Sequence, residues 1–395
     1  MPADDLDYGA AHEAEREVLS EIMGHAFATT PAGMVGWLER LGYDQLRVLR
    51  GPDGVRACLG LVPMGQIFGG RSLPIVGIVG VAVRSDWMRR GMATALMGRA
   101  LHEIRAGGVA ASSLYASTAS LYRRVGYECA GSRHLAELLP LLAPSFREPT
   151  PPLRARQATP DDLPAVQALY RSVAGHHEGF LDRGPYVWAR LCDERFGVRA
   201  HGLLFDDDDG LAGYLYYRKH PGADRHRVEV TDACARSPRA WRRIWIALGD
   251  LGTMVDCIEL PTAPHDPLYL HHPDPRFAVR LQENWLMRVT DVVAMLEGRG
   301  YAPGVAGRVE LRLEDPVLPE QAGAWQLEVE GGRGRLVRGG AGRLQLDARG
   351  LAAWCSGFVS PHALVQLGLG QGPPPVLELA GAIMAGPQPW MREMF

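Results

Sequence analysis

Helical and strand periods alternate along the first third of the chain. Apolar residues recur every three or four positions over 13–27 and 31–41, which predicts two amphipathic helices. A Val- and Ile-rich run that ends at Val83 predicts a buried strand, and the Ala- and Leu-rich pattern of 92–105 predicts the helix that follows it. Further elements are predicted as strands at 45–50, 57–63, 65–68 and 110–115 and as a helix from 120. This order is typical of an α/β domain.

A second region with a similar order of elements follows a proline-dense segment. Pro144–Pro152 is predicted to be a linker, because proline interrupts both helices and central strands. Thr159 and Pro160 are residue types preferred at a helix start, and a helix is predicted from there to Val173. The other predicted elements are strands at 202–205, 211–217, 227–233 and near 254–259, a helix over 237–252, and a solvated hairpin turn at 206–209.

The pattern of the last region predicts a smaller α+β module. Gly-rich turns join short predicted strands at 307–313, 325–330, 334–337 and 344–346, and helices are predicted at 291–298, 348–355, 361–368 and 376–384. A chain of 395 residues is long enough to bury a separate core in each region. We therefore expect domains at 1–147, 148–286 and 287–395.

Charge and cysteine usage exclude several classes of protein. The net charge of −3 gives no overall attraction to nucleic acid or to an anionic membrane. The six cysteines are scattered without a CxxC pair, which favours reduced thiols over disulfides or a zinc site. The acidic N-terminal stretch is not a signal peptide, and the longest apolar run is too short for a membrane helix. We expect a cytoplasmic protein.

The stretch from Pro74 to Gly91, PIVGIVGVAVRSDWMRRG, combines a strand, a turn and a helix start. Free N–H groups and the positive end of the helix dipole at such a start bind anions. Because Gly91 has no Cβ, a pyrophosphate can approach its main chain closely. A Walker loop is absent, and no GxGxxG follows a strand. The alternative is a buried strand that leads into an ordinary helix.

These residues resemble the acetyl-CoA site of the GNAT acetyltransferases. The segments Val81-Ala82-Val83 and Arg89-Arg90-Gly91-Met92-Ala93 match the family's strand and loop, whereas Met88 stands where Arg or Gln is usual. The departure at Met88 weakens the side-chain contribution to pyrophosphate binding and leaves the backbone donors unaffected. The resemblance implies an α/β GNAT fold that binds acetyl-CoA. It also implies a second, degenerate GNAT layer without this motif and a third region similar to sterol carrier proteins.

Acetyl transfer also needs an acid for the departing thiolate, and two tyrosines are candidates. Tyr122 falls on the predicted helix that follows the strand at 110–115, and a phenol can protonate a thiolate. Tyr127 follows Gly126 after the helical turn, a position that favours a packing role. Tyr122 is therefore the preferred acid, with Tyr127 as its competitor.

The combination of L-Y-x-R-x-G-Y at 121–127, a silent second GNAT layer, a sterol-carrier-like third region and a final Phe395 resembles the Eis family. This resemblance implies a hexameric N-acetyltransferase of aminoglycosides and other polyamines. It makes Tyr122 the general acid and the terminal carboxylate of Phe395 the general base. The acetyl-CoA contacts that it implies are Val81, Ala82, Val83, Arg89, Arg90, Gly91, Met92, Ala93, Thr94, Ser117 and Thr118.

Several further residues are weaker candidates for the substrate site. Phe27 and Trp37 are expected in the core, although the family's aromatic cleft suggests that they line the substrate. Tyr115 stands where relatives carry a histidine, so it bears on the substrate more than on the reaction. Glu393 and the N-terminal acids either attract a polycation or are simply solvated. The adjacent histidine pairs at 176–177 and 271–272 cannot share one face, and no metal is expected.

Two alternatives to aminoglycoside acetylation stay open at this point. The acceptor amine could belong to a lysine or a peptide, and the regiospecificity cannot be read from the sequence. A second alternative is a non-catalytic protein that binds a small apolar ligand on a GNAT scaffold. The strand motif, the phosphate loop and Tyr122 argue against it, since a silent layer does not need all three.

Overall fold

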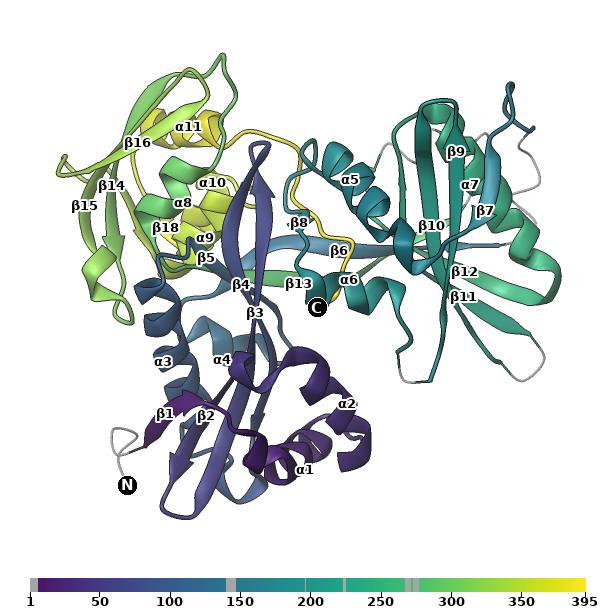
Figure 1. The fold of residues 1–395 in the computed structure, drawn as a ribbon. Helices are drawn as coiled ribbons and strands as arrows, with labels where there is room; N and C mark the ends of the chain where they lie inside the picture. The colour runs from purple at the N-terminus through teal and green to yellow at the C-terminus, as the bar shows by residue number, and fades with distance from the viewer. Residues whose placement is uncertain (1–5, 140–146, 196, 223–224, 267–270, 273–276) are drawn as a thin grey trace. The chain divides into compact units, whose positions relative to one another are not determined.

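The chain divides into two units, which the computed structural model describes over residues 6–139, 147–195, 197–222, 225–266, 271–272 and 277–395 (Figure 1). The first unit contains 1–131, 285–389 and Phe395, and the second contains 132–284 and 390–394. Strands β6 (Glu128–Leu138) and β13 (Ala278–Val289) each continue from one unit into the other. The predicted linker at 144–152 lies partly outside the described residues.

The first unit begins with a mixed sheet. Its strands are, in spatial order, β1 (Asp7–Ala10), β2 (Leu46–Gly51), β3 (Gly54–Phe68), β4 (Arg71–Val83), β5 (Ala111–Tyr115) and the C-terminal part of β13. Neighbours are antiparallel except β4 and β5, which are parallel. The strands predicted at 57–63 and 65–68 are one strand, β3, because the pairing with β4 continues through both.

Helices cover both faces of this sheet. On one face α3 (Met92–Ala106) packs Leu96 and Leu101 into a core with Val76 and Ile78 of β4, and the short α4 (Ala119–Arg123) adds Tyr122. On the other face lie α1 (Arg16–Ala26), which follows a 3-10 turn at 13–15, and α2 (Pro31–Leu41), capped by Thr30. The strand alternation therefore points neighbouring β4 side chains toward different helices.

The predicted α+β module completes the first unit. Its sheet has the order β16 (Arg333–Arg338), β15 (Gly323–Glu330), β14 (Gly307–Glu314), β17 (Leu344–Asp347) and β18 (Gly370–Gln371). The helices are α8 (Val292–Gly298), α9 (Ala348–Ser356), α10 (Pro361–Gln366) and α11 (Pro374–Ile383), which gather along the sheet in Figure 1. Side chains of Asp291, Asp347 and Ser360 cap the first three of them, which explains where these helices begin.

The second unit repeats the α/β arrangement. Its strands are, in order, β6, β12 (Val255–Thr262), β11 (His226–Ala235), β10 (Gly210–His220), β9 (Ala200–Asp207) and β7 (Arg154–Gln157), with the short β8 (Leu181–Asp182) elsewhere. The helices are α5 (Leu163–Ala174), α6 (Pro185–Cys192) and α7 (Pro238–Asp250). The predicted hairpin turn at 206–209 joins β9 to β10.

No helix among the described residues is long and apolar enough to cross a bilayer.

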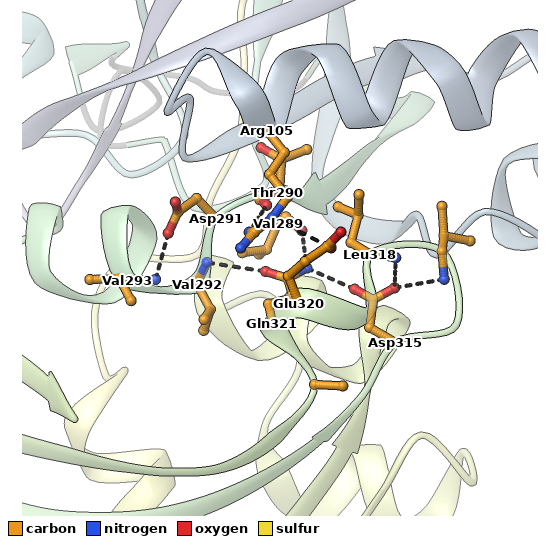
Figure 2. A network of polar contacts seen from close by, with 12 residues as sticks. Arg105, Val289, Thr290, Asp291, Val292, Val293, Asp315, Leu318, Glu320 and Gln321 are labelled. Carbon is orange, nitrogen blue, oxygen red and sulfur yellow. Dashed lines mark hydrogen bonds and ion pairs between the residues drawn. The ribbon is translucent and has the colours of Figure 1, made fainter. Parts of the chain in front are cut away.

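A buried polar network joins the α/β layer of the first unit to its α+β module (Figure 2). Asp315 accepts hydrogen bonds from the Gln321 amide and from the backbone N–H of Leu318, and it pairs with fully buried Arg288 of β13 at 2.7 Å. Arg288 Nε also donates to the Val125 carbonyl at 2.9 Å. Arg105 at the end of α3 donates to the Thr290 carbonyl at 2.8 Å.

Replacing Arg288 with leucine leaves Asp315 buried without its cation. Loss of one partner from a buried ion pair costs about 3–5 kcal/mol, so Arg288→Leu is expected to lower the melting temperature strongly in calorimetry. The matched control is Arg308→Leu, which breaks the exposed pair with Glu328 and is expected to change little. Equal melting temperatures for the two variants would contradict a structural role for the Arg288–Asp315 pair.

Candidate active site

The parallel pairing of β4 and β5 ends early, and a gap opens between the two strands. Ile75, Val76 and Gly77 of β4 pair with Ala111, Ser112 and Ser113 of β5, and β4 then continues to Val83 beyond this register. The edge of β4 from Ile78 onward thus presents backbone N–H and C=O groups that β5 does not use. Such an edge can hold an extended ligand by main-chain hydrogen bonds.

A β-bulge distorts β4 beside this gap. Gly60 of β3 faces Val79, whereas Cys58 faces Ala82, so β4 carries one extra residue between these pairs. Gly80 in the bulge has φ +61°, and a Cβ there would lie 2.7 Å from the Trp37 ring of α2. Glycine is therefore required at Gly80, and Trp37 lies against the bulge.

The predicted phosphate loop ends at an uncapped helix start. Gly91 is the N-cap of α3 in the left-handed conformation, with φ +79°, and no side chain caps the helix. The first N–H bonded inside the helix is that of Ala95, to the Gly91 carbonyl at 2.9 Å. The N–H groups of Met92, Ala93 and Thr94 precede it and point out of the helix end. Apart from its own chain neighbours, no atom of the described residues lies within 4 Å of a Cβ built on Gly91, so the space beside it is open to an anion.

Trp87 anchors this loop to the turn between β2 and β3. Its indole N–H donates to Asp53 at 3.1 Å, and the guanidinium of Arg56 lies 3.5 Å from its ring centroid. Arg84 also pairs with Asp53, and this hydrogen bond is the main reason that the pKa of the Asp53 carboxyl lies well below its usual range. Arg90 stacks at 4.8 Å from the Trp87 ring. The sequence analysis does not single out Asp53, because this contact joins it to residues more than thirty positions away.

The two candidate tyrosines have different surroundings. Tyr127 is fully buried, and its hydroxyl lies 2.7 Å from the Ser112 hydroxyl. Tyr122 is 8% exposed, and its hydroxyl makes no hydrogen bond with any residue that the structure describes. Burial raises the pKa of Tyr122 to about 12, so the phenol keeps its proton at neutral pH. Tyr127 already has a buried partner, whereas the Tyr122 hydroxyl is available to donate.

Phe395 lies where the gap between β4 and β5 begins. Its ring centroid is 5.6 Å from that of Tyr115, and its Cε2 lies 2.8 Å from a Cβ built on Gly77. Gly77 is the last residue of β4 that pairs with β5. Strand alternation puts Gly77 on the face opposite Val76 and Ile78, and hence opposite α3.

The other predicted site residues are spread more widely. Ser117 and Thr118 form the exposed turn before α4, and Arg89, Arg90 and Met88 are exposed in the loop. Val81 and Val83 are half-buried against the α3 core, and Ala82 is buried. The sequence analysis expected Phe27 in the core, but its side chain, at the end of α1, is 47% exposed. Among the described residues no group of three or more His, Cys, Asp or Glu could hold a metal.

Glu393 and part of the N-terminal segment do not present free charges. Glu393 is buried in the second unit and pairs with Arg183, so it is not a solvated surface acid as the alternative held. Arg183 also pairs with Asp232, and all three charged side chains are almost fully buried. Asp7 and Glu15 pair with Arg50, whereas residues 1–5 lie outside the described part of the chain.

The corresponding place in the second unit is closed. There β11 pairs with β12 only as far as Glu229 and Glu259, but the Ser237 side chain caps α7 by accepting from the Ala240 N–H at 3.2 Å. The chain's own segment 390–394 lies beside β6 and β11: the Met391 N–H donates to the Ser132 carbonyl at 3.1 Å, and Arg392 donates to the Ala233 carbonyl. The helix that follows this parallel pair therefore starts with a side-chain cap, unlike α3.

Family models match three parts of the chain. Acetyltransferase (GNAT) domain models match residues 8–130 and 179–289, and a sterol carrier protein domain model matches 292–392. An uncharacterised N-acetyltransferase of Streptomyces avermitilis is 29% identical over 347 residues, 83% of each chain. The N-acetyltransferase Eis of Mycobacterium tuberculosis is 28% identical over 275 residues, which span 67% of this chain and 65% of that protein.

Solved structures agree with these matches. A GCN5-related N-acetyltransferase from Anabaena variabilis has a TM-score of 0.94 at 28% identity, covering 99% of this chain and 100% of that one. Eis1 from Mycobacterium abscessus has a TM-score of 0.79 at 25% identity, with the same coverage. The chain is an Eis-like N-acetyltransferase. The predicted tandem α/β GNAT fold with a sterol-carrier-like α+β domain is confirmed, whereas the domain limits stay predictions.

GNAT acetyltransferases use acetyl-CoA, and the loop of this Eis-like N-acetyltransferase fits its pyrophosphate. The fit rests on the uncapped N-terminus of α3, on the open space beside Gly91 and on the exposed Arg89 and Arg90. These residues would hold the donor, whose thioester supplies the acetyl group.

Replacing Gly91 with valine is expected to weaken acetyl-CoA binding at least about tenfold, because a β-branched residue is strained at positive φ and its Cβ fills the approach of the phosphate. The matched control is Gly108→Val at the opposite end of α3, where φ is +68° and the space is equally open. Acetyl-CoA should raise the melting temperature of the control as it does for the native chain, and less for Gly91→Val. Equal shifts for both variants would mean that the phosphates bind elsewhere.

Proposed function

We propose that this protein transfers the acetyl group of acetyl-CoA to an amine of an aminoglycoside-like or other small polyamine. The observation that carries the proposal is the meeting of three features in the first unit. The gap between β4 and β5 opens after Gly77, the ring of Phe395 lies against Gly77, and β4 leads to an uncapped anion site at Gly91. The donor is thus assigned to the part of the chain from Ile78 to Gly91, and the acceptor amine and the base are assigned to its beginning, beside Gly77.

The donor is assigned to the α3 side of the sheet. The N–H groups at the start of α3 and the guanidiniums of Arg89 and Arg90 hold the pyrophosphate, as the open loop supports. The free edge of β4 from Ile78 to Val83 binds the pantetheine arm and polarises the thioester carbonyl through its N–H groups. Ser117 and Thr118, in the turn before α4, complete the implied contacts.

Tyr122 is assigned as the general acid. Its Oη donates a proton to the thiolate sulfur as the carbon–sulfur bond breaks. The raised pKa, about 12, supports this role because it keeps the phenol protonated until the thiolate forms. Since the folded-state pKa lies above the ordinary value of about 10, loss of the Tyr122 proton is not expected to limit turnover below about pH 10.

The carboxylate of Phe395 is assigned as the base. A terminal carboxyl has an ordinary pKa of about 3.3–3.7, far below that of an amine, so it acts by positioning the ammonium and accepting its proton directly or through a water. Such a role requires a fixed chain end. Segment 390–394 supports it, because backbone bonds to Ser132 and Glu178 and the Glu393–Arg183 pair hold that segment in place.

Aromatic side chains support an organic polycation as the acceptor. Tyr115 lies beside Phe395, Trp37 lies against the bulge at Gly80, and Phe27 exposes its ring at the end of α1. Aromatic faces attract ammonium groups. Lysine or peptide amines are the other acceptor class, and incubation with acetyl-CoA, a thiol reagent and both classes of amine tests the proposal. The hexamer implied by the family resemblance stays a prediction.

Tyr122→Phe keeps the ring and removes only the donor. We expect kcat to fall by about 10²–10⁴ with acetyl-CoA binding nearly unchanged, as measured by thiol release and by titration calorimetry. Tyr127→Phe is the matched control, because it removes the bond to Ser112, costs about 1 kcal/mol of stability and leaves kcat close to native. A larger loss of kcat in Tyr127→Phe would transfer the acid role to Tyr127.

Deleting Phe395 moves the terminal carboxylate by one residue and removes the ring that touches Tyr115. We expect acetyl transfer to be lost while the melting temperature changes little, because segment 390–394 keeps its hydrogen bonds. Phe395→Leu separates the two effects, since it keeps the carboxylate in place and should retain most of the activity. A short C-terminal extension should abolish turnover as deletion does. Full activity in the deleted or extended chain would refute the terminal base.

A further inference from the structure

The second unit contains a cavity whose walls are rich in arginine. It has a volume of about 120 Å³ and is lined by β10, β11, α6 and segment 390–394. Five guanidinium-bearing residues contribute to its walls: Arg133, Arg190, Arg195, Arg218 and Arg392. We call it the arginine cavity. A second cavity of about 200 Å³ shares Arg133, Glu229 and Gln282 with it.

The carboxylates in this wall do not balance the arginines. Glu393 pairs with Arg183, which is outside the lining, and Glu229 contacts the imidazole of His220 at 2.8 Å. Arg392 has Asp232 at 4.0 Å. Within the described residues, no carboxylate pairs with Arg133, Arg190 or Arg218.

The partners of those three arginines are backbone carbonyls. Arg133 Nε donates to the Arg392 carbonyl at 3.0 Å, and Arg190 Nε donates to the Met394 carbonyl at 2.8 Å. Arg218 donates to the carbonyls of Arg190 and Asp193 at 2.7 and 2.8 Å. Carbonyl oxygens satisfy donors but carry no net charge, so no described carboxylate neutralises these three guanidiniums at hydrogen-bond distance, although Glu229 and Asp193 lie near Arg218.

Burial makes this excess of charge costly. Arg218 is 3% exposed and Arg392 is 7% exposed. Burial and the neighbouring Arg190 lower the pKa of Arg195 to about 10, and burial also lowers the pKa of Arg218. Like charges that repel in a poorly solvated place are stabilised by an anion between them.

We propose that the arginine cavity binds a small oxyanion, such as inorganic phosphate or a small carboxylate. The volume of 120 Å³ corresponds to about four waters at roughly 30 Å³ each, which suits a tetrahedral oxyanion and excludes a nucleotide. Planar guanidiniums present paired donors that match phosphate and carboxylate oxygens.

The site also bears on the chain end. Arg190 and Arg133 hold the carbonyls of Met394 and Arg392, so an anion that orders these arginines would stiffen the segment that precedes Phe395. This consequence rests on the proposed function, whereas oxyanion binding itself does not. The two are therefore tested separately.

The first experiment measures the melting temperature of the full chain against phosphate and against malonate, at constant ionic strength set with chloride. Because phosphate also suits the start of α3, the titration is done in the Gly91→Val background as well as in the native chain. We expect a rise of about 3 °C for each tenfold increase above the dissociation constant, in both backgrounds, for at least one of the two anions. A rise with phosphate alone or malonate alone identifies the preferred oxyanion, and no rise with either overturns the proposal.

Variants assign the response to the cavity. Arg195→Gln and Arg133→Gln, which are only half-buried, should each weaken the anion response at least about fivefold while still folding. Arg308→Gln, at an exposed position of β14, is the matched control and should respond like the native chain. An unchanged response in both cavity variants overturns the proposal. A short C-terminal extension, which keeps the Met394 carbonyl as an amide, should leave the anion response intact, so a failure of the terminal base is distinguishable from a failure of this site.

Discussion

The early end of the pairing between β4 and β5 is the constraint on which the candidate active site depends. After Gly77 and Ser113 the two strands share no further register, although β4 continues to Val83. Buried backbone groups without partners cost about 1–3 kcal/mol each, so a strand edge of this kind is stable only where water or a ligand can satisfy it. The ring of Phe395 lies against Gly77, where the pairing ends, and the bulge at Gly80 follows three residues later on β4.

The two GNAT layers differ in the start of the helix that follows the central parallel pair of strands. In both layers the central parallel pair separates, after Gly77 in the first and after Glu229 in the second. In the first layer the following helix starts at Gly91 with no side-chain cap, whereas in the second the Ser237 hydroxyl caps it. A capped start has fewer free N–H groups to offer an anion. The chemistry of one N-cap residue therefore distinguishes the two layers.

Local patterns predicted the strand, the loop and the helices that carry Val81, Gly91 and Tyr122, because strand period and glycine at a helix start are local properties. The roles of these residues came from the family resemblance and stay predictions. The anchoring of Trp87 by Asp53 and the ring of Phe395 on Gly77 join residues far apart in sequence, so composition and period do not signal them. Strands β6 and β13 and helix α6 were also missed. The first half of β13 is largely exposed and mixes polar with apolar residues, which hides its strand period.

Charge, more than apolar packing, sets the register of the C-terminal segment. Trp390 and Met391 are buried, but apolar contacts tolerate a shift by one residue better than ion pairs do. Arg183 is bound to Asp232 within the second unit, and Glu393 is the residue of the segment that meets it. A slip by one position would place Arg392 or Met394 against Arg183 and leave a buried charge uncompensated, which is strongly unfavourable. The degenerate layer thus fixes the register of segment 390–394.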